Sequence, residues 1–241
     1  MNQGLPRRLY SLSGVVPLGA YVLIHIWVTA SIGSSLALYD RQVGFLHGGV
    51  LLGLLEIVLV LVPLAYHAVY GIIRSLQPHE AHAGAHGYDN DLMLTLQRAS
   101  GIAVLVFVVL HVWEFRGHTW TGGLPVGSYS TKLIEDLSST TWGIPWIALG
   151  YLAGIAATLF HLVSGMSSFC RTWGYATSPG ALRRARVVFR ATGILFFLIS
   201  AVLVVQLATG ARLFSKHEPS RDATCGETVP SALPALPAPP R

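Results

Sequence analysis

Five segments of this chain are long and apolar enough to cross a lipid bilayer as helices. A membrane-spanning helix needs ~20 consecutive, mostly apolar residues. The five segments cover residues 14–36, 45–73, 99–115, 142–169 and 187–207. Charged residues make up only 11% of the 241 residues, less than half of the ~25% that is usual in soluble domains. The sequence therefore predicts an all-α membrane protein with five transmembrane helices, and it excludes a soluble enzyme, a disordered chain, a collagen and a coiled coil.

Arginines gather on one side of the predicted bundle. Nine fall in the N-terminal segment and in the two loops on its side: Arg7, Arg8, Arg74, Arg98, Arg171, Arg183, Arg184, Arg186 and Arg190. The opposite loops hold Arg41, Arg116 and Lys132. Because cytoplasmic loops are enriched in Lys and Arg, we expect a multi-pass protein of the cell inner (cytoplasmic) membrane, with its N-terminus inside and its C-terminus outside. The cluster at 183–186 is expected to contact membrane lipid, and the net charge of +5 indicates no nucleic-acid partner.

The residues before the first span and the cysteines exclude a cleaved signal peptide and several kinds of cofactor site. Arg7 and Arg8 stand directly before the first apolar run, so we expect an uncleaved first helix rather than a signal peptide. The two cysteines are Cys170 and Cys225, and the chain has no C-x-x-C-H motif. Covalent c-type haem, iron–sulfur clusters and thiolate zinc sites therefore lack ligands within this chain.

Two loops have features of their own. The hydrophilic loop 75–97 contains three histidines: His79, His82 and His86. A metal site is one interpretation of this loop, but a solvated loop is favoured because no carboxylate or cysteine completes a metal-binding spacing. The outer loop 117–141 is predicted to contain a short amphipathic helix over residues 132–137.

Four histidines lie well inside the predicted spans, one on each of the first four: His25, His67, His111 and His161. Ionisable side chains are costly in lipid and usually mark a functional site. Because imidazole is the usual axial ligand of haem iron, these four suffice for two haem b groups in a four-helix bundle. Packing or a proton relay is the alternative. On the haem interpretation, residues 1–212 form a transmembrane dihaem cytochrome b domain, and residues 213–241 form an extended, disordered tail.

The depths of the four histidines sort them into two pairs. At ~1.5 Å per residue, His67 lies about 10 Å and His161 about 13–15 Å from the cytoplasmic edge. His25 lies about 18 Å and His111 about 20 Å from the same edge. We therefore predict that His67 and His161 ligate an inner haem. His25 and His111 are predicted to ligate an outer haem.

An internal repeat supports this pairing. The first span contains LSGVVPLGAYVLIHIW, and the third contains the similar ASGIAVLVFVVLHVW. The second contains YHAVYG and the fourth FHLVSG, each with an aromatic residue before the histidine and a glycine four residues after it. The first two spans thus correspond to the next two. Chance similarity among apolar sequences is the alternative.

Glycine and arginine share a helix face with the inner histidines. Residues i+4 and i+7 lie on the same face as residue i, so Gly71 and Arg74 follow His67 in one stripe. Gly71 would leave room for a porphyrin, and Arg74 would contact a propionate. Gly165 repeats the first step in the fourth span, where a serine replaces the arginine. Ordinary close packing of helices is the alternative explanation of both glycines.

Two carboxylates near the outer end are candidate catalytic residues. Glu56 precedes His67 by eleven residues, about three turns, and so shares its face ~16 Å further out. Glu114 follows His111 by three residues. A buried carboxylate can exchange protons with a quinone or line a proton path. An interfacial or helix-pairing role is the alternative for both.

The chain resembles a known family of membrane cytochromes. The resemblance rests on RRLYSLSGVVPLGAYVLIH near the N-terminus and on the H-x-x-x-G-x-x-R pattern of His67, Gly71 and Arg74. Over residues 5–210 the chain is similar to the cytochrome b membrane-anchor subunits of succinate:quinone oxidoreductase and fumarate reductase. The class in question has one anchor polypeptide, five spans and two haems. The resemblance implies the same ligand pairs that depth predicts.

The resemblance also implies partners and a place in an enzyme complex. A flavoprotein subunit with FAD and an iron–sulfur subunit would dock on the cytoplasmic face. Electrons from succinate would pass through the iron–sulfur subunit and this chain to a quinone, for which menaquinone is expected. Some members carry a Glu two residues before the fourth histidine for transmembrane proton transfer. Leu159 stands there in this chain, so a proton path of that kind is not expected.

Polar residues at the inner ends of the first three spans complete the predicted site. They are expected to bind haem propionates or the iron–sulfur partner: Arg8, Ser11, Arg74, Arg98 and Ser100. One candidate quinone site lies at this inner rim, near Arg8, Ser11 and Ser13. The other lies at the outer end, near Glu56 and Glu114. It is favoured because a carboxylate in hydrocarbon is costly unless it is paired or neutral.

Three other interpretations are open on sequence grounds. The dihaem cytochrome b of a hydrogenase or a formate dehydrogenase would share the helices and haems but face another redox partner. The R-x-x-S-x-S-G opening at residues 8–14 is not expected there. A haem-free transporter or channel would use the histidines as a proton relay, and in a purely structural anchor they would only pack.

Overall fold

The computed structural model describes residues 4–77 and 87–210, and the regular structure in these ranges is helical. An isolated bridge joins Thr141 to Ile144, and the described residues contain no β-strand. The predicted tail 213–241 lies outside the described residues, and so do the three histidines of the inner loop: His79, His82 and His86.

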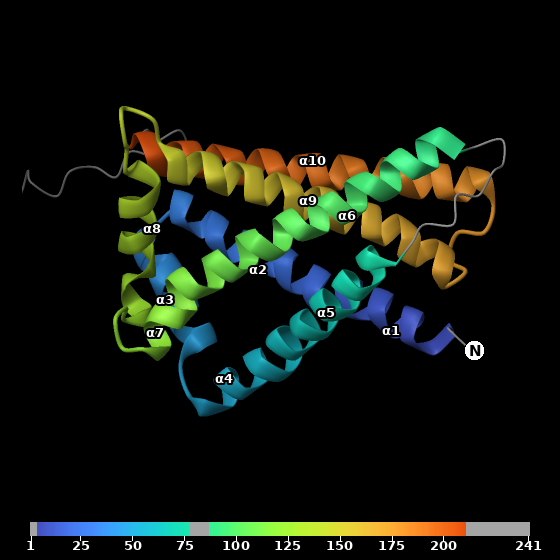
Figure 1. Cartoon of the computed structure of the whole chain (residues 1–241). Helices are drawn as coiled ribbons and strands as arrows, with labels where there is room; N and C mark the ends of the chain where they lie inside the picture. Colours follow the sequence, from blue (N-terminus) through green and yellow to red (C-terminus); the bar gives the residue numbers. More distant parts are fainter. Residues whose placement is uncertain (1–3, 78–86, 211–241) are drawn as a thin grey trace, which may run out of the picture.

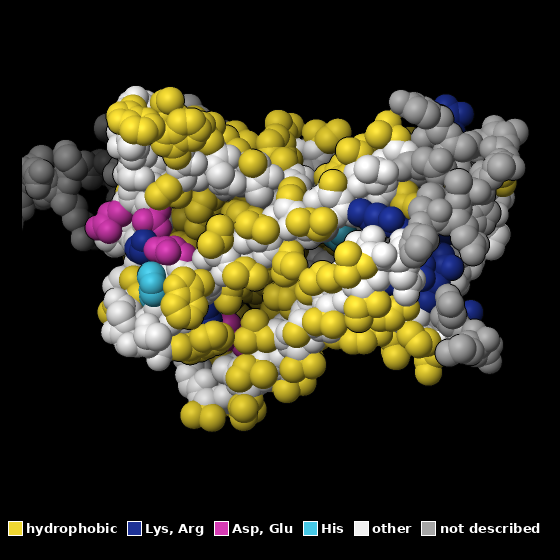
Figure 2. All heavy atoms as spheres, in the orientation of Figure 1, with side chains coloured by type: hydrophobic (Ala, Val, Ile, Leu, Met, Phe, Trp, Pro, Cys, Tyr) yellow, Lys and Arg dark blue, Asp and Glu magenta, His cyan; other side chains and the backbone are white. Residues whose placement is uncertain are grey.

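Among the residues that the structure describes, five helical stretches are long and apolar enough to cross a membrane: Leu5–Gly33, Val50–Leu76, Leu92–Trp120, Trp146–Thr172 and Pro179–Thr209. Apolar side chains cover much of the face that Figure 2 shows. Val50 is 83% exposed and Trp27 is 76% exposed. Because soluble proteins rarely leave large apolar patches in water, this surface faces lipid. The predicted all-α membrane class with five spans is confirmed.

Within the described ranges, ten α-helices make up these spans and the segments between them: α1 (Gly4–Ser13), α2 (Ala20–Ala30), α3 (Leu36–His47), α4 (Val50–Glu56), α5 (Val62–Leu76), α6 (Gly87–Val112), α7 (His118–Trp120), α8 (Tyr129–Ser138), α9 (Trp146–Thr172) and α10 (Pro179–Thr209). Wide π-helical turns interrupt the first three spans at Gly14–Gly19, Ile57–Leu61 and Trp113–Gly117. Short 3₁₀ turns lie at Ser31–Gly33 and Val126–Ser128. Because π-helical turns are frequent at functional sites, these three positions indicate where to look for one.

The helices extend beyond the predicted spans. The first begins at Leu5 instead of residue 14, and the third begins at Leu92 instead of residue 99. Hydropathy marks the hydrocarbon core, whereas a helix can continue into the polar boundary of the bilayer. The predicted hydrophilic loop 75–97 is therefore wrong over residues 87–97, which belong to α6.

Helix α3 was not predicted, and it shifts the start of the second span. Ser35 begins this helix by accepting a hydrogen bond from the backbone N–H of Leu38. Gly49 then adopts a φ of 90°, a backbone conformation that glycine adopts readily. This turn separates α3 from α4, so the second span begins at Val50 instead of residue 45.

Helices α3 and α8 close one end of the bundle. Helix α8 runs across the end where α9 begins and α10 ends (Figure 1), and it confirms the short helix predicted in the outer loop. Buried side chains of α3 and α8, such as Val43 and Leu137, belong to the same hydrophobic cluster. The Asp40 carboxylate accepts hydrogen bonds from the backbone N–H of Ser130 at 3.3 Å and from its hydroxyl at 2.6 Å. This end of the bundle, which the sequence predicts to be the outer one, is therefore a packed cap.

Candidate functional site

The four membrane histidines face one another in two pairs. The ring centroids of His67 and His161 are 6.2 Å apart, and those of His25 and His111 are 5.7 Å apart. All four side chains line one cavity of about 930 Å³. This volume is near the upper end of the ~300–1,000 Å³ range of ligand sites. The structure thus brings together the same inner and outer pairs that the depths indicate.

The spacing within each pair fits one iron held between two imidazoles. With metal–nitrogen bonds of about 2 Å, imidazoles on opposite sides of an iron have ring centroids roughly 6 Å apart. The ring planes cross at 88° in the inner pair and 76° in the outer pair, which rotation about the metal–nitrogen bonds allows. Within residues 4–77 and 87–210, no three His, Cys, Asp or Glu residues group as a metal site. The centroid distances of the two pairs fit a haem held between two histidines.

His67 reaches from α5 to the end of α1. Its Nδ1 lies 3.2 Å from the Tyr10 carbonyl oxygen and 3.3 Å from the Ser13 hydroxyl. That hydroxyl donates to the same carbonyl at 2.9 Å. The carbonyl favours a proton on Nδ1, which leaves the Nε2 lone pair free for a metal. The Tyr10 ring also stacks on the imidazole, with centroids 4.5 Å apart.

His161 repeats this arrangement against α6. Its Nδ1 lies 3.2 Å from the Gln97 carbonyl oxygen and 3.3 Å from the Ser100 hydroxyl. The buried Ser100 donates to that carbonyl at 3.0 Å. The Gln97 side-chain amide donates to the His161 carbonyl at 3.2 Å. The Gln97 Nε2 also lies 3.3 Å from Nδ1 of His161, a contact that Tyr10 cannot make. The internal sequence repeat therefore corresponds to a repeated pair of contacts, from the carbonyl and from the serine hydroxyl.

Gly14 and Gly101 make room for the two imidazoles. A Cβ at Gly14 would collide with Cε1 of His67, and a Cβ at Gly101 would lie 3.0 Å from Cε1 of His161. These glycines were not predicted to take part. The signal was present, because a Ser-Gly pair stands at the same place in LSGVVPLG and ASGIAVLV.

Most of the predicted inner-rim residues line the cavity: Ser11, Gly71, Arg74, Arg98 and Gly165. Arg8 lies instead over the Trp173 ring, with its guanidinium carbon 5.8 Å from the centroid. The Trp173 indole also donates to the Ser11 hydroxyl at 3.0 Å. Arg7, which was not assigned a role, lines the cavity. The porphyrin and propionate contacts of these residues stay predictions.

Aromatic rings hold the outer pair. Tyr21 stacks on His25, and Phe107 stacks on His111, with centroids 5.7 Å apart in both cases. Each aromatic residue precedes its histidine by four positions, one helical turn. The Tyr151 hydroxyl lies 3.3 Å from Nδ1 of His111. This contact occupies Nδ1 and leaves Nε2 available.

Glu56 forms an ion pair at the end of the cavity that is predicted to be the outer one. Arg116 donates to both carboxylate oxygens, from Nε at 3.1 Å and from Nη2 at 2.6 Å. The two side chains are 14% and 13% exposed, respectively. Nδ1 of His47 lies 3.5 Å from the carboxylate and makes no hydrogen bond. All three residues line the cavity, although neither His47 nor Arg116 was predicted to belong to a site.

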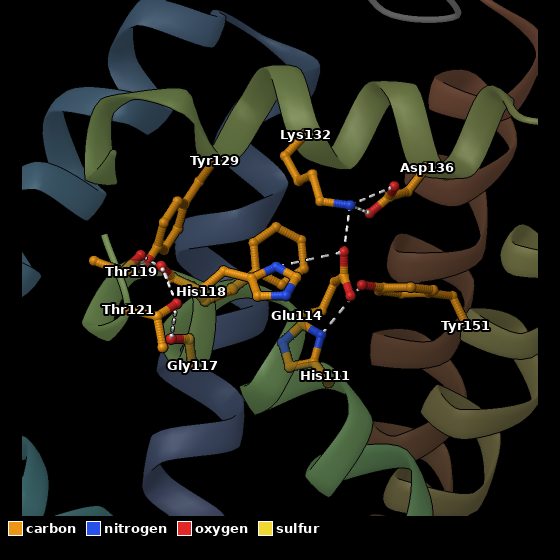
Figure 3. A network of polar contacts seen from close by, with 11 residues as sticks. His111, Glu114, Gly117, His118, Thr119, Thr121, Tyr129, Lys132, Asp136 and Tyr151 are labelled. Atoms are coloured by element: carbon orange, nitrogen blue, oxygen red, sulfur yellow. Dashed lines mark hydrogen bonds and ion pairs between the residues drawn. The ribbon is translucent and has the colours of Figure 1, made fainter. Parts of the chain in front are cut away.

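Glu114 contacts α8 (Figure 3). The Lys132 ammonium contacts the Glu114 carboxylate and lies 2.7 Å from the Asp136 carboxylate. Nδ1 of His118 lies 4.0 Å from the Glu114 carboxylate. Although partial burial opposes the charge of Lys132, hydrogen bonds with Asp136 and Glu114 keep its pKa above the usual value. Glu114 is not among the described residues that line the cavity. This position favours the helix-pairing interpretation.

A comparison with curated proteins identifies a relative. The chain is 31% identical over 196 residues to a protein of Bacillus subtilis (strain 168) named succinate dehydrogenase cytochrome b558 subunit. The matched region covers 81% of this chain and 91% of the relative. Comparisons with models of known protein families and with solved structures find no match.

Proposed function

Because this chain belongs to the family of succinate dehydrogenase cytochrome b subunits, we propose that it binds two haem b groups through which electrons from an iron–sulfur subunit reach a membrane quinone. His67 and His161 would hold the inner haem, and His25 and His111 the outer one. The observation that carries the proposal is the pairing of four imidazoles along one cavity. When bound, haem supplies reversible one-electron transfer.

The chain's own residues orient the ligands. The carbonyls of Tyr10 and Gln97 would accept the Nδ1 protons of the inner pair and so leave each Nε2 free to hold iron. His67 lies beside Gly14, which precedes His25 by eleven helical residues, so the inner and outer levels are about 16 Å apart. This separation is larger than the predicted depths give, because those depths were counted from span limits that the helices do not keep. That is roughly half of the ~30 Å hydrocarbon core. The two levels therefore divide the crossing of the membrane into two shorter steps.

The partner subunits would dock at the arginine-rich end of the bundle. Lys and Arg side chains are prominent at the end where the chain starts, whereas Asp and Glu side chains gather at the α8 end (Figures 1 and 2). By the positive-inside rule, the arginine-rich end faces the cytoplasm, with the N-terminus inside and the C-terminus outside. The flavoprotein with FAD and the iron–sulfur subunit would bind there.

The quinone, which we propose to be menaquinone, would bind at the outer end. Glu56, Arg116 and His47 line the cavity there. The ion pair with Arg116 offsets the cost of placing the Glu56 carboxylate in the membrane. Nδ1 of His47 faces the same carboxylate and has no hydrogen-bond partner. A proton could therefore pass between the quinone and the side chain of Glu56 or His47. The inner rim is the second candidate.

Glu56→Gln should slow succinate-driven quinone reduction about 100-fold, because glutamine can accept the Arg116 hydrogen bonds but cannot take up a proton. Both haems should be retained and should still be reduced by succinate. Turnover and haem spectra of the purified complex measure the two effects. Glu135→Gln, at an exposed position of α8, is the control. Unchanged turnover would make Glu56 structural and would move the quinone site to the inner rim.

Purification of the whole complex tests the proposed function. We expect flavoprotein and iron–sulfur subunits to co-purify, and succinate to reduce b-type haem in the preparation. Dithionite should reveal two haems per chain. Absence of a b-type α-band after dithionite would favour a haem-free histidine relay. Haems reduced by hydrogen or formate, but not by succinate, would favour another dihaem cytochrome.

A further inference from the structure

Each inner histidine is held by a five-residue segment, and the two segments have the same arrangement of polar groups. The segments are Tyr10–Gly14 and Gln97–Gly101, and we call each of them a cradle. Each presents a carbonyl at its first position, a serine hydroxyl at its fourth and a glycine at its fifth. The corresponding distances agree within 0.1 Å: 3.2 and 3.2 Å from Nδ1 to the carbonyl, 3.3 and 3.3 Å from Nδ1 to the hydroxyl, and 2.9 and 3.0 Å from hydroxyl to carbonyl.

We propose that the two cradles are positioning devices that set the redox potential of the inner haem and leave the outer haem unaffected. The proposal rests on the proposed function, in which His67 and His161 ligate that haem. The cradle residues would act through the histidines.

The mechanism is competition for one carbonyl oxygen. In each cradle the serine hydroxyl and the imidazole Nδ1–H both donate to the carbonyl of the first residue. The hydroxyl-to-carbonyl distance is shorter than the hydroxyl-to-Nδ1 distance, so the hydroxyl proton lies on the carbonyl. Removal of the hydroxyl takes away a side-chain donor that shares this carbonyl with the imidazole and with the helix backbone. The stronger Nδ1–H bond then makes the ligand more basic, which stabilises ferric iron.

The glycines set how closely each imidazole approaches its carbonyl. A side chain at Gly14 would collide with His67, whereas a Cβ at Gly101 would lie 3.0 Å from His161. Alanine at position 14 must therefore displace the imidazole, and alanine at position 101 needs a smaller shift. The expected loss of the inner haem is larger for Gly14→Ala than for Gly101→Ala.

The outer histidines have different surroundings. His25 and His111 rest on aromatic rings one turn earlier, and Nδ1 of His111 faces the Tyr151 hydroxyl. The cradle serines lie about 16 Å of helix away from the outer level. Their removal should therefore change one haem only.

Redox titration of the whole complex tests the proposal with Ser13→Ala, Ser100→Ala and the double variant. At fixed ambient potential, the ratio of oxidised to reduced inner haem should rise in each single variant. In the double variant it should rise about tenfold, the lower end of effects from residues that support metal ligands. The inner haem is the one whose signal His67→Ala removes. The low-spin electron paramagnetic resonance signal of the same haem should shift. Ser167→Ala is the control, because that hydroxyl donates to the Val163 carbonyl of its own helix at 3.3 Å.

An unchanged or raised potential of the inner haem would overturn the proposal, and so would an equal shift of the outer haem. A wild-type complex without reducible haem would overturn the proposed function instead. Gly14→Ala should lose the inner haem, whereas Gly150→Ala, with open space around its Cβ position, should keep both. If Gly14→Ala does not assemble, the serine variants decide the question.

Discussion

Replacing His67 with alanine is expected to reduce the haem content from two per chain to one. Without this imidazole, His161 is left as a single ligand in the inner part of the cavity. His25 and His111 form a separate pair on other helices, so the outer haem should remain. Haem-to-protein ratio and the dithionite-reduced spectrum measure the loss.

Two comparisons sharpen this result. His161→Ala should remove the same spectral component as His67→Ala, whereas His111→Ala should remove the other. His118→Ala should keep both haems, because this side chain is 40% exposed and faces Glu114. Two haems in His67→Ala would refute the ligand assignment. Loss of both haems in that variant, with the other subunits still bound, would show that the two sites assemble together rather than independently.

The transmembrane part of the fold could be predicted because one physical requirement dominates it. Each span must bury about 20 apolar residues in lipid, and this leaves an unmistakable run in the sequence. Helix α3 left no such run. It is stabilised by contacts with residues far away in the sequence, such as the hydrogen bond from Ser130 to Asp40 and the packing of Leu137 in the same hydrophobic cluster. Residues 87–97 were missed because polar residues extend a helix without any hydropathy signal.

The histidine pairs could be predicted because helical rise converts sequence position into depth. The cradles could not, because depth does not say which neighbour a side chain touches. His67 and Ser13 are 54 residues apart, and His161 and Ser100 are 61 apart. Those contacts depend on how adjacent helices rotate about their axes. The repeat contained the clue, since the same Ser-Gly pair precedes both contacts, but only the structure gives it a meaning.

Glu56 shows a similar limit. Its place in an apolar span indicated that something must offset its charge, and a quinone was the visible candidate. Arg116 is 60 residues away and stood in the sequence as a loop cation. The π-helical turn at Trp113–Gly117 includes this arginine, and the fold brings it to the carboxylate. Loss of this ion pair should therefore lower the stability of the protein.

Arg116→Leu is expected to destabilise the outer end by roughly 3 kcal/mol, because breaking an ion pair that is largely shielded from solvent leaves one charge without its partner. The side chains are 13% and 14% exposed, so the effect should lie near the lower end of the ~3–5 kcal/mol range for such losses. The outer haem should dissociate at a lower temperature, and the inner haem should be affected less. Thermal loss of each haem band in the purified complex measures this difference.

The double variant Glu56→Met, Arg116→Leu separates two effects: the loss of the ion pair and the cost of leaving the Glu56 carboxylate unpaired. Replacing both partners by apolar residues is often nearly neutral, so most of the lost stability should return. Lys132→Met is the control at a more exposed pair, where the expected cost is about 1 kcal/mol or less. If Arg116→Leu were no more harmful than Lys132→Met, Glu56 would have to be neutral without its arginine. A neutral Glu56 would be a proton donor in the cavity. The opposite outcome is that Arg116→Leu is strongly destabilised and the double variant recovers its stability. That outcome would show that Arg116 keeps Glu56 in its carboxylate form.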